Sequence, residues 1–269
     1  MKISIITLFP KMISGFFEES IVKRAIEKKL VEIEIINLRD FAIDDYGSVD
    51  DRPYGGGAGM ILRADVIYKA IISVIPTEVE GSKKKDSSSS STPRNDRGWV
   101  VLTSPKGKIF DQKKAQEYSK LSHLIIIAGH YEDVDARVLE YVDEEVSMGD
   151  FVLTGGEIPA SAIADSVVRL IPGVLKKDEA TRQESFNIDN KKLLEYPQYT
   201  RPDDFMDKKV PQVLLSGDPK KIGKWQKEQA LIETHRKRPD LLDPSITFTS
   251  SRGLRPRVGG ARMRGRHST

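Results

Sequence analysis

The chain has 269 residues, of which 31% are charged, with a net charge of +3 and no cysteine. This length suffices for one large domain, or for a medium and a small domain, with a core that needs no cross-links. The lack of cysteine excludes disulfides and thiolate metal sites and favours a reducing, cytoplasmic setting. No run of about 18 apolar residues occurs, so we expect no membrane span.

The first half of the chain alternates strand-like and helix-like segments. Its start, MKISIITLFPKM, predicts a buried strand rather than a signal peptide, because Pro10 and a polar helix follow the apolar run. Strands joined by crossover helices predict an α/β domain with a mostly parallel sheet. The predicted strands are residues 3–8, 32–36, 99–103 and 123–128, and the predicted helices are residues 20–30, 64–75 and 111–121.

Polar segments divide the chain. Residues 78–98 contain three consecutive lysines and five consecutive serines and predict a flexible surface insertion in a first domain of residues 1–175. Residues 176–190 are polar and predict an interdomain linker. A second domain at residues 191–243 contains a predicted helix over 220–238 with seven lysines and arginines. Such a basic helix suits docking of a nucleic-acid substrate, although charge alone fits a solvated helix face equally well.

The last residues, 244–269, form a basic tail that we expect to be disordered. They include six arginines and no acidic residue, and without them the chain would carry a net charge of −3. Such a tail can contact RNA phosphates without sequence specificity, or it can be a dispensable extension.

Four glycine-rich or turn-rich loops lie at residues 52–59, 104–107, 129–132 and 149–157. The second and third directly follow predicted strands, and in an open parallel sheet such loops form the ligand crevice. No P-loop and no G-x-G-x-x-G sequence occurs, which disfavours a nucleotide hydrolase and an ordinary Rossmann-type methyltransferase. The pattern therefore predicts a small-molecule pocket built late in the first domain.

These loops belong to longer segments that resemble the bacterial tRNA (guanine-N(1)-)-methyltransferase family of the trefoil-knotted (SPOUT) superfamily. The resemblance runs in order over roughly residues 1–243, which makes it far more specific than any single motif. The matching segments are ISIITLFP at 3–10, DDRPYGGGAGM at 50–60, LTSPKG at 102–107, GHYEDVDARV at 129–138, SMGDFVLTGGEIPA at 147–160, RLIPGVL at 169–175, ESF at 184–186, YPQYTRP at 196–202 and VPQVLLSG at 210–217.

The resemblance implies an α/β domain with a trefoil-knotted, mostly parallel sheet, followed by a small helical C-terminal domain that helps to hold tRNA. It implies a homodimer with active sites at the subunit interface, S-adenosylmethionine as cofactor, and methylation of the guanine 3′ of the anticodon. The implied cofactor-binding residues are Thr103, Ser104, Pro105, Gly129, Tyr131, Glu132, Met148, Gly149, Asp150, Phe151, Val152, Leu153, Gly155 and Gly156.

Methylation of guanine N1 requires two groups from the enzyme. N1 carries a proton near neutral pH, so a general base must remove it, and the negative charge that develops on O6 favours a nearby cation. By the resemblance, Glu184 is the general base, at a position where the family usually has an aspartate, and Arg169 stabilises O6. Outside that context, Glu184 reads as an exposed linker carboxylate and Arg169 as a helix-capping side chain.

Other residues are candidates for smaller roles. Glu132 is expected to face the methionine or sulfonium end of the cofactor, with a salt bridge as the simpler interpretation. Asp133 replaces a glycine that the family commonly has, which adds a carboxylate beside the cofactor pocket. Arg52 and Tyr54 are expected to approach the substrate or the partner subunit. The four histidines lack metal-ligand spacing, so we expect no bound zinc, while magnesium assistance stays open.

The sequence is also compatible with two alternative functions. A related knotted methyltransferase acting on ribosomal RNA or on a ribose oxygen would share the cofactor pocket. A noncatalytic RNA-binding module would bind RNA without the cofactor. Within the favoured reading, Asp150 or Asp165 would take the base role if Glu184 does not.

Overall fold

The structure is a computed structural model, and it describes residues 1–75, 98–176, 184–188 and 191–242. The chain divides into two compact units, Met1–Asp189 and Asn190–Thr269. Most of the expected insertion, part of the expected linker and the basic tail lie outside the described residues.

The first unit is built on a five-stranded parallel sheet with the strand order β2-β1-β6-β5-β8. The predicted α/β domain with a mostly parallel sheet is therefore confirmed. The central strand of the sheet, β6, is buried at every residue. The strands are β1 (Lys2–Thr7), β2 (Glu32–Asn37), β5 (Trp99–Ile109), β6 (His123–Ala128) and β8 (Glu144–Ser147).

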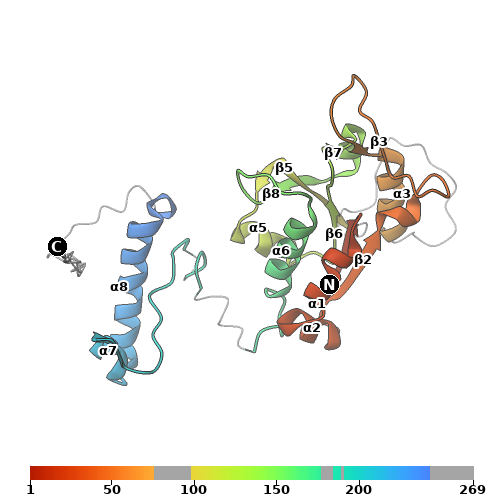
Figure 1. The fold of residues 1–269 in the computed structure, drawn as a ribbon. Helices are drawn as coiled ribbons and strands as arrows, with labels where there is room; N and C mark the ends of the chain where they lie inside the picture. The colour runs from red at the N-terminus through yellow and green to blue at the C-terminus, as the bar shows by residue number, and fades with distance from the viewer. Residues whose placement is uncertain (76–97, 177–183, 189–190, 243–269) are drawn as a thin grey trace, which may run out of the picture. The chain divides into compact units, whose positions relative to one another are not determined.

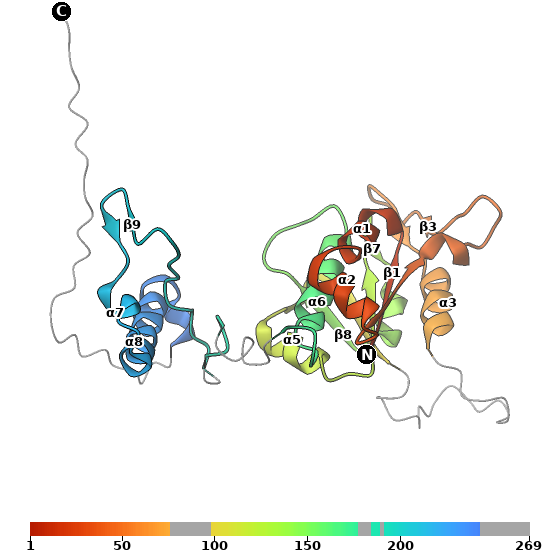
Figure 2. The ribbon, with the colours of Figure 1, turned by 90° about the horizontal axis from the view of Figure 1, so that it is seen from below.

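Alternate residues of the central strands enter two separate cores, one on each face of the sheet. Helices α2 (Ser20–Glu27), α5 (Gln112–Tyr118) and α6 (Glu157–Val168) cover one face. Helix α3 (Ala64–Val74) covers the opposite face, as Figures 1 and 2 show. The predicted helices at 20–30, 64–75 and 111–121 are confirmed, with shorter bounds.

A small second sheet of β3 (Asp50–Asp51), β4 (Ile61–Leu62) and β7 (Asp133–Val134) was not predicted. Strand β4 pairs antiparallel with β3 and parallel with β7. This sheet therefore holds the ends of the glycine loop at 52–59 beside the loop at 129–132. Short 3-10 and helical turns complete the unit at η1 (Pro10–Met12), α1 (Ser14–Phe17), η2 (Leu38–Phe41) and η3 (Ala136–Tyr141).

Strand β5 extends beyond the predicted residues 99–103, and it does so through a bulge. Its pairing with β8 shifts between Thr103 and Lys108, so residues 104–107 leave the ladder. A Cβ on Gly107 would overlap the backbone of Glu145 and Val146. Glycine at this position therefore lets the bulge lie directly against β8.

The second unit contains β9 (Asp204–Phe205), β10 (Lys208–Lys209), α7 (Gln212–Leu215), α8 (Pro219–Lys237) and η5 (Pro239–Leu241). The predicted helix at 220–238 is confirmed as α8. It begins where the Asp218 side chain accepts hydrogen bonds from the backbone N–H groups of Lys220 and Lys221. In the part of the chain that the structure describes, no helix combines the length and apolar character of a membrane span.

Candidate active site

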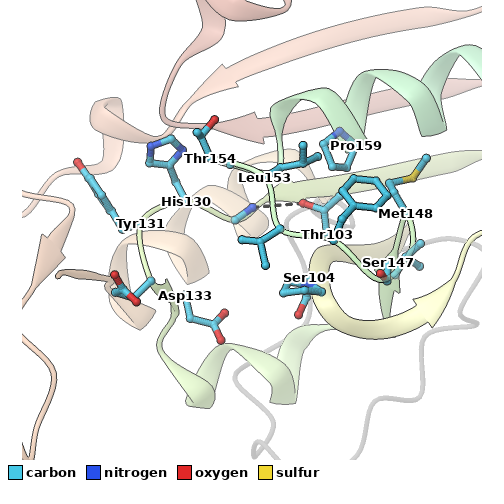
Figure 3. Close-up of a pocket in the computed structure, with 18 residues that line it drawn as sticks. Thr103, Ser104, His130, Tyr131, Asp133, Ser147, Met148, Leu153, Thr154 and Pro159 are labelled. Atoms are coloured by element: carbon cyan, nitrogen blue, oxygen red, sulfur yellow. Dashed lines mark hydrogen bonds between the residues drawn. The ribbon is translucent and has the colours of Figure 1, made fainter. Parts of the chain in front are cut away.

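A pocket opens at the carboxyl-terminal edge of the parallel sheet, at the bulge of β5 and the ends of β6 and β8 (Figure 3). The empty space inside it, with the open mouth included, is about 670 Å³. Every cofactor-binding residue expected from the sequence lines this pocket except Gly149 and Asp150. Asp133, expected beside the pocket, and His130, in the expected pocket loop, also line it. Four further lining residues were not expected from the sequence, namely Val146, Ser147, Thr154 and Pro159.

The floor of the pocket depends on close approach of two backbone loops. Gly156 donates its N–H to the carbonyl of Gly129 at 2.6 Å. The Thr103 hydroxyl donates to the carbonyl of Ile127 at 3.1 Å and accepts from the Gly129 N–H at 3.3 Å, the latter drawn in Figure 3. A Cβ on Gly156 would overlap the Thr103 hydroxyl and lie 2.7 Å from the Gly129 nitrogen. Glycine is therefore required here for space.

The mouth of the pocket carries apolar side chains. Phe151, Val152 and Leu153 are exposed by 55%, 85% and 40% respectively, and all three line the pocket. Exposed apolar side chains grouped around a cavity mark a binding surface. Phe151 offers a flat aromatic face, and all three offer apolar surface, to which a planar ring such as adenine can bind.

Two consecutive carboxylates, Glu132 and Asp133, also line the pocket. A Cβ on Gly59 would overlap the Glu132 side chain, so the glycine loop at 52–59 reaches this residue. Asp133 forms a very short ion pair with Lys106, which raises the pKa of the lysine above its usual value. Acidic groups in a small pocket favour a cationic ligand, and S-adenosylmethionine carries its charge on the sulfonium and amino groups.

The residues present therefore fit the cofactor that the sequence predicts. The glycine floor admits close backbone contact, the apolar mouth suits a nucleobase, and the carboxylates suit a positively charged tail. No group of three or more potential metal ligands occurs within the residues that the structure describes.

Glu184 and Arg169 lie together in the first unit. The guanidinium of Arg169 donates from Nη1 to Oε1 of Glu184 at 2.7 Å and from Nη2 to Oε2 at 2.6 Å. Arg169 is the C-cap residue directly after α6, and its side chain is 34% exposed, against 16% for Glu184. Neither residue lines the pocket. The structure thus joins the two residues expected to act on guanine but does not place them in the pocket wall of the same chain.

Arg52 and Tyr54 line a different cavity, between β4 and η3. Tyr54 is fully exposed. Their expected contact with substrate or a partner subunit stays a prediction.

A parallel α/β sheet with a glycine-lined pocket at its carboxyl edge defines a small-molecule-binding α/β protein. A family model described as tRNA (Guanine-1)-methyltransferase TrmD matches residues 1–244. The chain therefore belongs to the tRNA (guanine-1)-methyltransferase family, and it is a methyltransferase.

Curated relatives agree with this family. A protein named tRNA (guanine-N(1)-)-methyltransferase from Dictyoglomus turgidum is 49% identical, with 90% of each chain covered. Relatives of the same name come from Syntrophomonas wolfei, at 48% identity over 90% of each chain, and Bacillus pumilus, at 45% over 93% of this chain and 95% of the relative.

Proposed function

We propose that this protein transfers a methyl group from S-adenosylmethionine to N1 of the guanine 3′ of the anticodon in tRNA. The observation that carries the proposal is the match of nearly the whole chain to one family together with a pocket whose lining suits the cofactor. We place the protein in the cytoplasm, where its tRNA substrate is found.

The cofactor would lie in the pocket and supply an electrophilic methyl group. The backbone of the loops at 129–132 and 149–157 would hold the adenosine, while Glu132 would face the positively charged end of the cofactor. The in-line geometry of transfer requires only that the enzyme align donor and acceptor. A knotted arrangement of these late loops, as in the family, belongs to the same proposal.

Glu184 would accept the N1 proton, and Arg169 would face O6 as negative charge develops there. The two side chains are joined by a bidentate contact that occupies both carboxylate oxygens. Displacement of one of these contacts would free a carboxylate oxygen for N1 and a guanidinium N–H for O6, so the guanine edge and the ion pair are complementary.

The protein would act as a homodimer. The Glu184–Arg169 pair does not line the pocket of its own chain, and a partner subunit would bring a pair to each pocket. The exposed apolar side chains at the pocket mouth, including Phe151 and Val152, suit such an interface.

The second unit would contribute to tRNA binding. Helix α8 carries four lysines in its first half and two cations at its end, and Trp225 on this helix has its ring centroid 6.3 Å from those of Tyr196 and Tyr199. Cations beside aromatic rings are a common RNA-binding combination. This unit would therefore act as a helical tRNA-binding domain.

The test compares two unmodified tRNA transcripts that differ only in the base 3′ of the anticodon. With labelled S-adenosylmethionine, we expect mass spectrometry to find one methyl group on the guanine-containing tRNA and none when adenine replaces that guanine. Unchanged incorporation would contradict the assigned substrate. Absence of calorimetric heat with millimolar S-adenosylhomocysteine would instead favour a noncatalytic RNA-binding protein.

A further inference from the structure

A buried carboxylate lies directly behind the wall of the pocket. Glu157 is the first residue of α6, and it is only 1% exposed. Its Oε1 accepts a hydrogen bond from the hydroxyl of Thr7, the last residue of β1, at 2.9 Å. A buried carboxylate at this position needs partners for its other oxygen as well, because an unpaired buried polar atom costs free energy.

The second oxygen faces a histidine. Oε2 of Glu157 lies 3.5 Å from Nδ1 of His130, and the His130 side chain is 15% exposed. Within the described residues, these two atoms are both buried and both lack a hydrogen-bond partner. The gap is about half an ångström longer than a typical N–H···O bond, a difference that a small rotation of either side chain supplies. An imidazole N–H can donate and a carboxylate oxygen can accept. Two such buried atoms that face each other and have no other partner therefore indicate a hydrogen bond between them.

The backbone around this pair makes room for it. A Cβ on Gly155 would overlap both Glu157 Oε2 and His130 Nδ1. Gly155 also forms an isolated antiparallel bridge with His130. The lack of a side chain at Gly155 thus leaves room for the Glu157 carboxylate and the His130 imidazole to face each other.

His130 belongs to the pocket wall. Its ring packs against Phe9, with centroids 4.6 Å apart, and against Tyr131, with centroids 5.0 Å apart. Tyr131 has a positive φ of 60°, a conformation that non-glycine residues adopt only when their surroundings hold them there. The ring of His130 is therefore placed to hold the strained turn that leads to Glu132.

We propose that Glu157 is a positioning residue that holds His130 as its Nδ1–H tautomer, and through this ring fixes Tyr131 and Glu132 in the cofactor pocket. The carboxylate joins the end of β1, the loop after β6 and the start of α6. With the proton on Nδ1, the lone pair lies on Nε2. This inference rests on the proposal that the pocket binds S-adenosylmethionine.

The tautomer of His130 is the direct test. In protein labelled with ¹⁵N-histidine, we expect the His130 signals, assigned by their loss in His130→Gln, to show a protonated Nδ1. In Glu157→Gln, the amide oxygen keeps the Thr7 hydrogen bond and the NH₂ group faces Nδ1, so the proton moves to Nε2. If Glu157 only stabilised the fold, Glu157→Gln would leave the proton of His130 on Nδ1. An unprotonated Nδ1 in the wild-type protein, or an unchanged tautomer in Glu157→Gln, overturns the proposal.

Ligand binding provides the second measurement. We expect Glu157→Gln to weaken binding of S-adenosylhomocysteine about tenfold, as for loss of a buried hydrogen bond, and to raise the KM for S-adenosylmethionine more than it lowers kcat. The matched control, Glu140→Gln, makes the same chemical change at an exposed carboxylate and should leave both unchanged. Wild-type affinity in Glu157→Gln would contradict the positioning role.

A pair of variants at His130 covers the case in which Glu157→Gln does not fold. The side-chain amide of His130→Asn can place an N–H where Nδ1 was, whereas His130→Leu cannot donate. We expect the asparagine variant to keep S-adenosylhomocysteine affinity within about threefold and the leucine variant to lose about tenfold. Equal losses overturn the inference. If the wild-type protein binds no S-adenosylhomocysteine, the proposed function fails, while the tautomer still reports on the Glu157–His130 contact.

Discussion

At the scale of single residues, the proposed role of Glu184 as the general base gives a specific prediction. Glu184→Gln keeps the size of the side chain but cannot accept the N1 proton, so we expect kcat to fall about 10²- to 10⁴-fold. Affinity for S-adenosylhomocysteine should stay within about twofold of wild type, because Glu184 does not line the pocket. Steady-state methylation assays and calorimetry measure the two quantities.

Glu184→Asp is the matched control for this change. It keeps the carboxylate, and an aspartate is what the family usually carries here, so it should retain much more activity than the glutamine variant. Full activity in Glu184→Gln would remove the base role from this residue. Loss of activity in Asp150→Asn or Asp165→Asn would then identify the replacement.

Gly156 makes a second residue-scale prediction. In Gly156→Ala, the added methyl overlaps the Thr103 hydroxyl and approaches the Gly129 nitrogen to 2.7 Å, so the two loops of the pocket floor must separate. We expect more than a tenfold loss of S-adenosylhomocysteine affinity and a destabilisation of about 1–3 kcal/mol. Calorimetry and thermal unfolding measure these effects.

Gly223 supplies the control for that substitution. It lies in α8, and a Cβ there would have no neighbour within 4 Å. Gly223→Ala should therefore preserve cofactor affinity and stabilise the helix by up to about 1 kcal/mol. If Gly156→Ala binds the ligand as the wild-type protein does, the glycine floor is not the cofactor cradle.

At the scale of elements, the sequence predicted the central strands and their helices because their apolar residues follow the periods of buried strands and amphipathic helices. Strand β8 escaped prediction because it begins with Glu144 and Glu145, which read as a polar connection. In the structure, the Glu144 carboxylate accepts a hydrogen bond from the Tyr118 hydroxyl at 2.8 Å and forms an ion pair with Lys114 at 3.0 Å. Only the folded chain supplies these partners.

The pocket was predictable for a different reason. Its loops carry family motifs, so most of the residues that the resemblance assigns to the cofactor line one pocket, while their role in binding it stays a prediction. The role of Glu157 was not accessible, because its partners Thr7 and His130 are distant in sequence and come from different elements. A glutamate at a helix start is ordinarily an exposed residue beside the helix dipole, and nothing in the local pattern marks this one as buried.

The Lys106–Asp133 ion pair links the β5 bulge to β7 across the pocket. Lys106 is 70% exposed, so the pair contributes little to stability, but it neutralises a carboxylate that lines the pocket. Lys106→Met should therefore favour cationic S-adenosylmethionine over S-adenosylhomocysteine, whose sulfur is neutral. We expect the ratio of their dissociation constants to shift about two- to fivefold, with a smaller shift at high salt.

Lys108→Met is the control for this change, since Lys108 is also exposed and follows on the same strand. Lys108→Met removes an equal charge but leaves the Lys106–Asp133 ion pair intact. The ratio of the dissociation constants of S-adenosylmethionine and S-adenosylhomocysteine should therefore change by less than in Lys106→Met. Identical shifts in the two variants would show that only the net charge matters and that the ion pair does not influence the pocket.

At the scale of the whole molecule, the two halves of the proposed chemistry lie on different parts of the first unit. The pocket is formed by the bulge of β5 and the loops after β6 and β8, whereas the Glu184–Arg169 pair lies at the far end of α6. A methyl donor and a base must meet at one guanine. A dimer satisfies this requirement if each pocket receives the acid–arginine pair of the partner subunit.

Mixed dimers test this arrangement. At S-adenosylmethionine concentrations well below its dissociation constant for Gly156→Ala, that variant leaves its pocket largely empty, and Glu184→Gln lacks the base, so each variant alone should show little activity. If one site uses the pocket of one subunit and Glu184 of the other, a mixed dimer contains one site with both defects and one intact site. Random pairing of equal amounts should then restore about a quarter of the wild-type activity per chain. If both groups act within a single chain, every site in the mixture carries at least one defect, and purified mixed dimers should be as inactive as either parent.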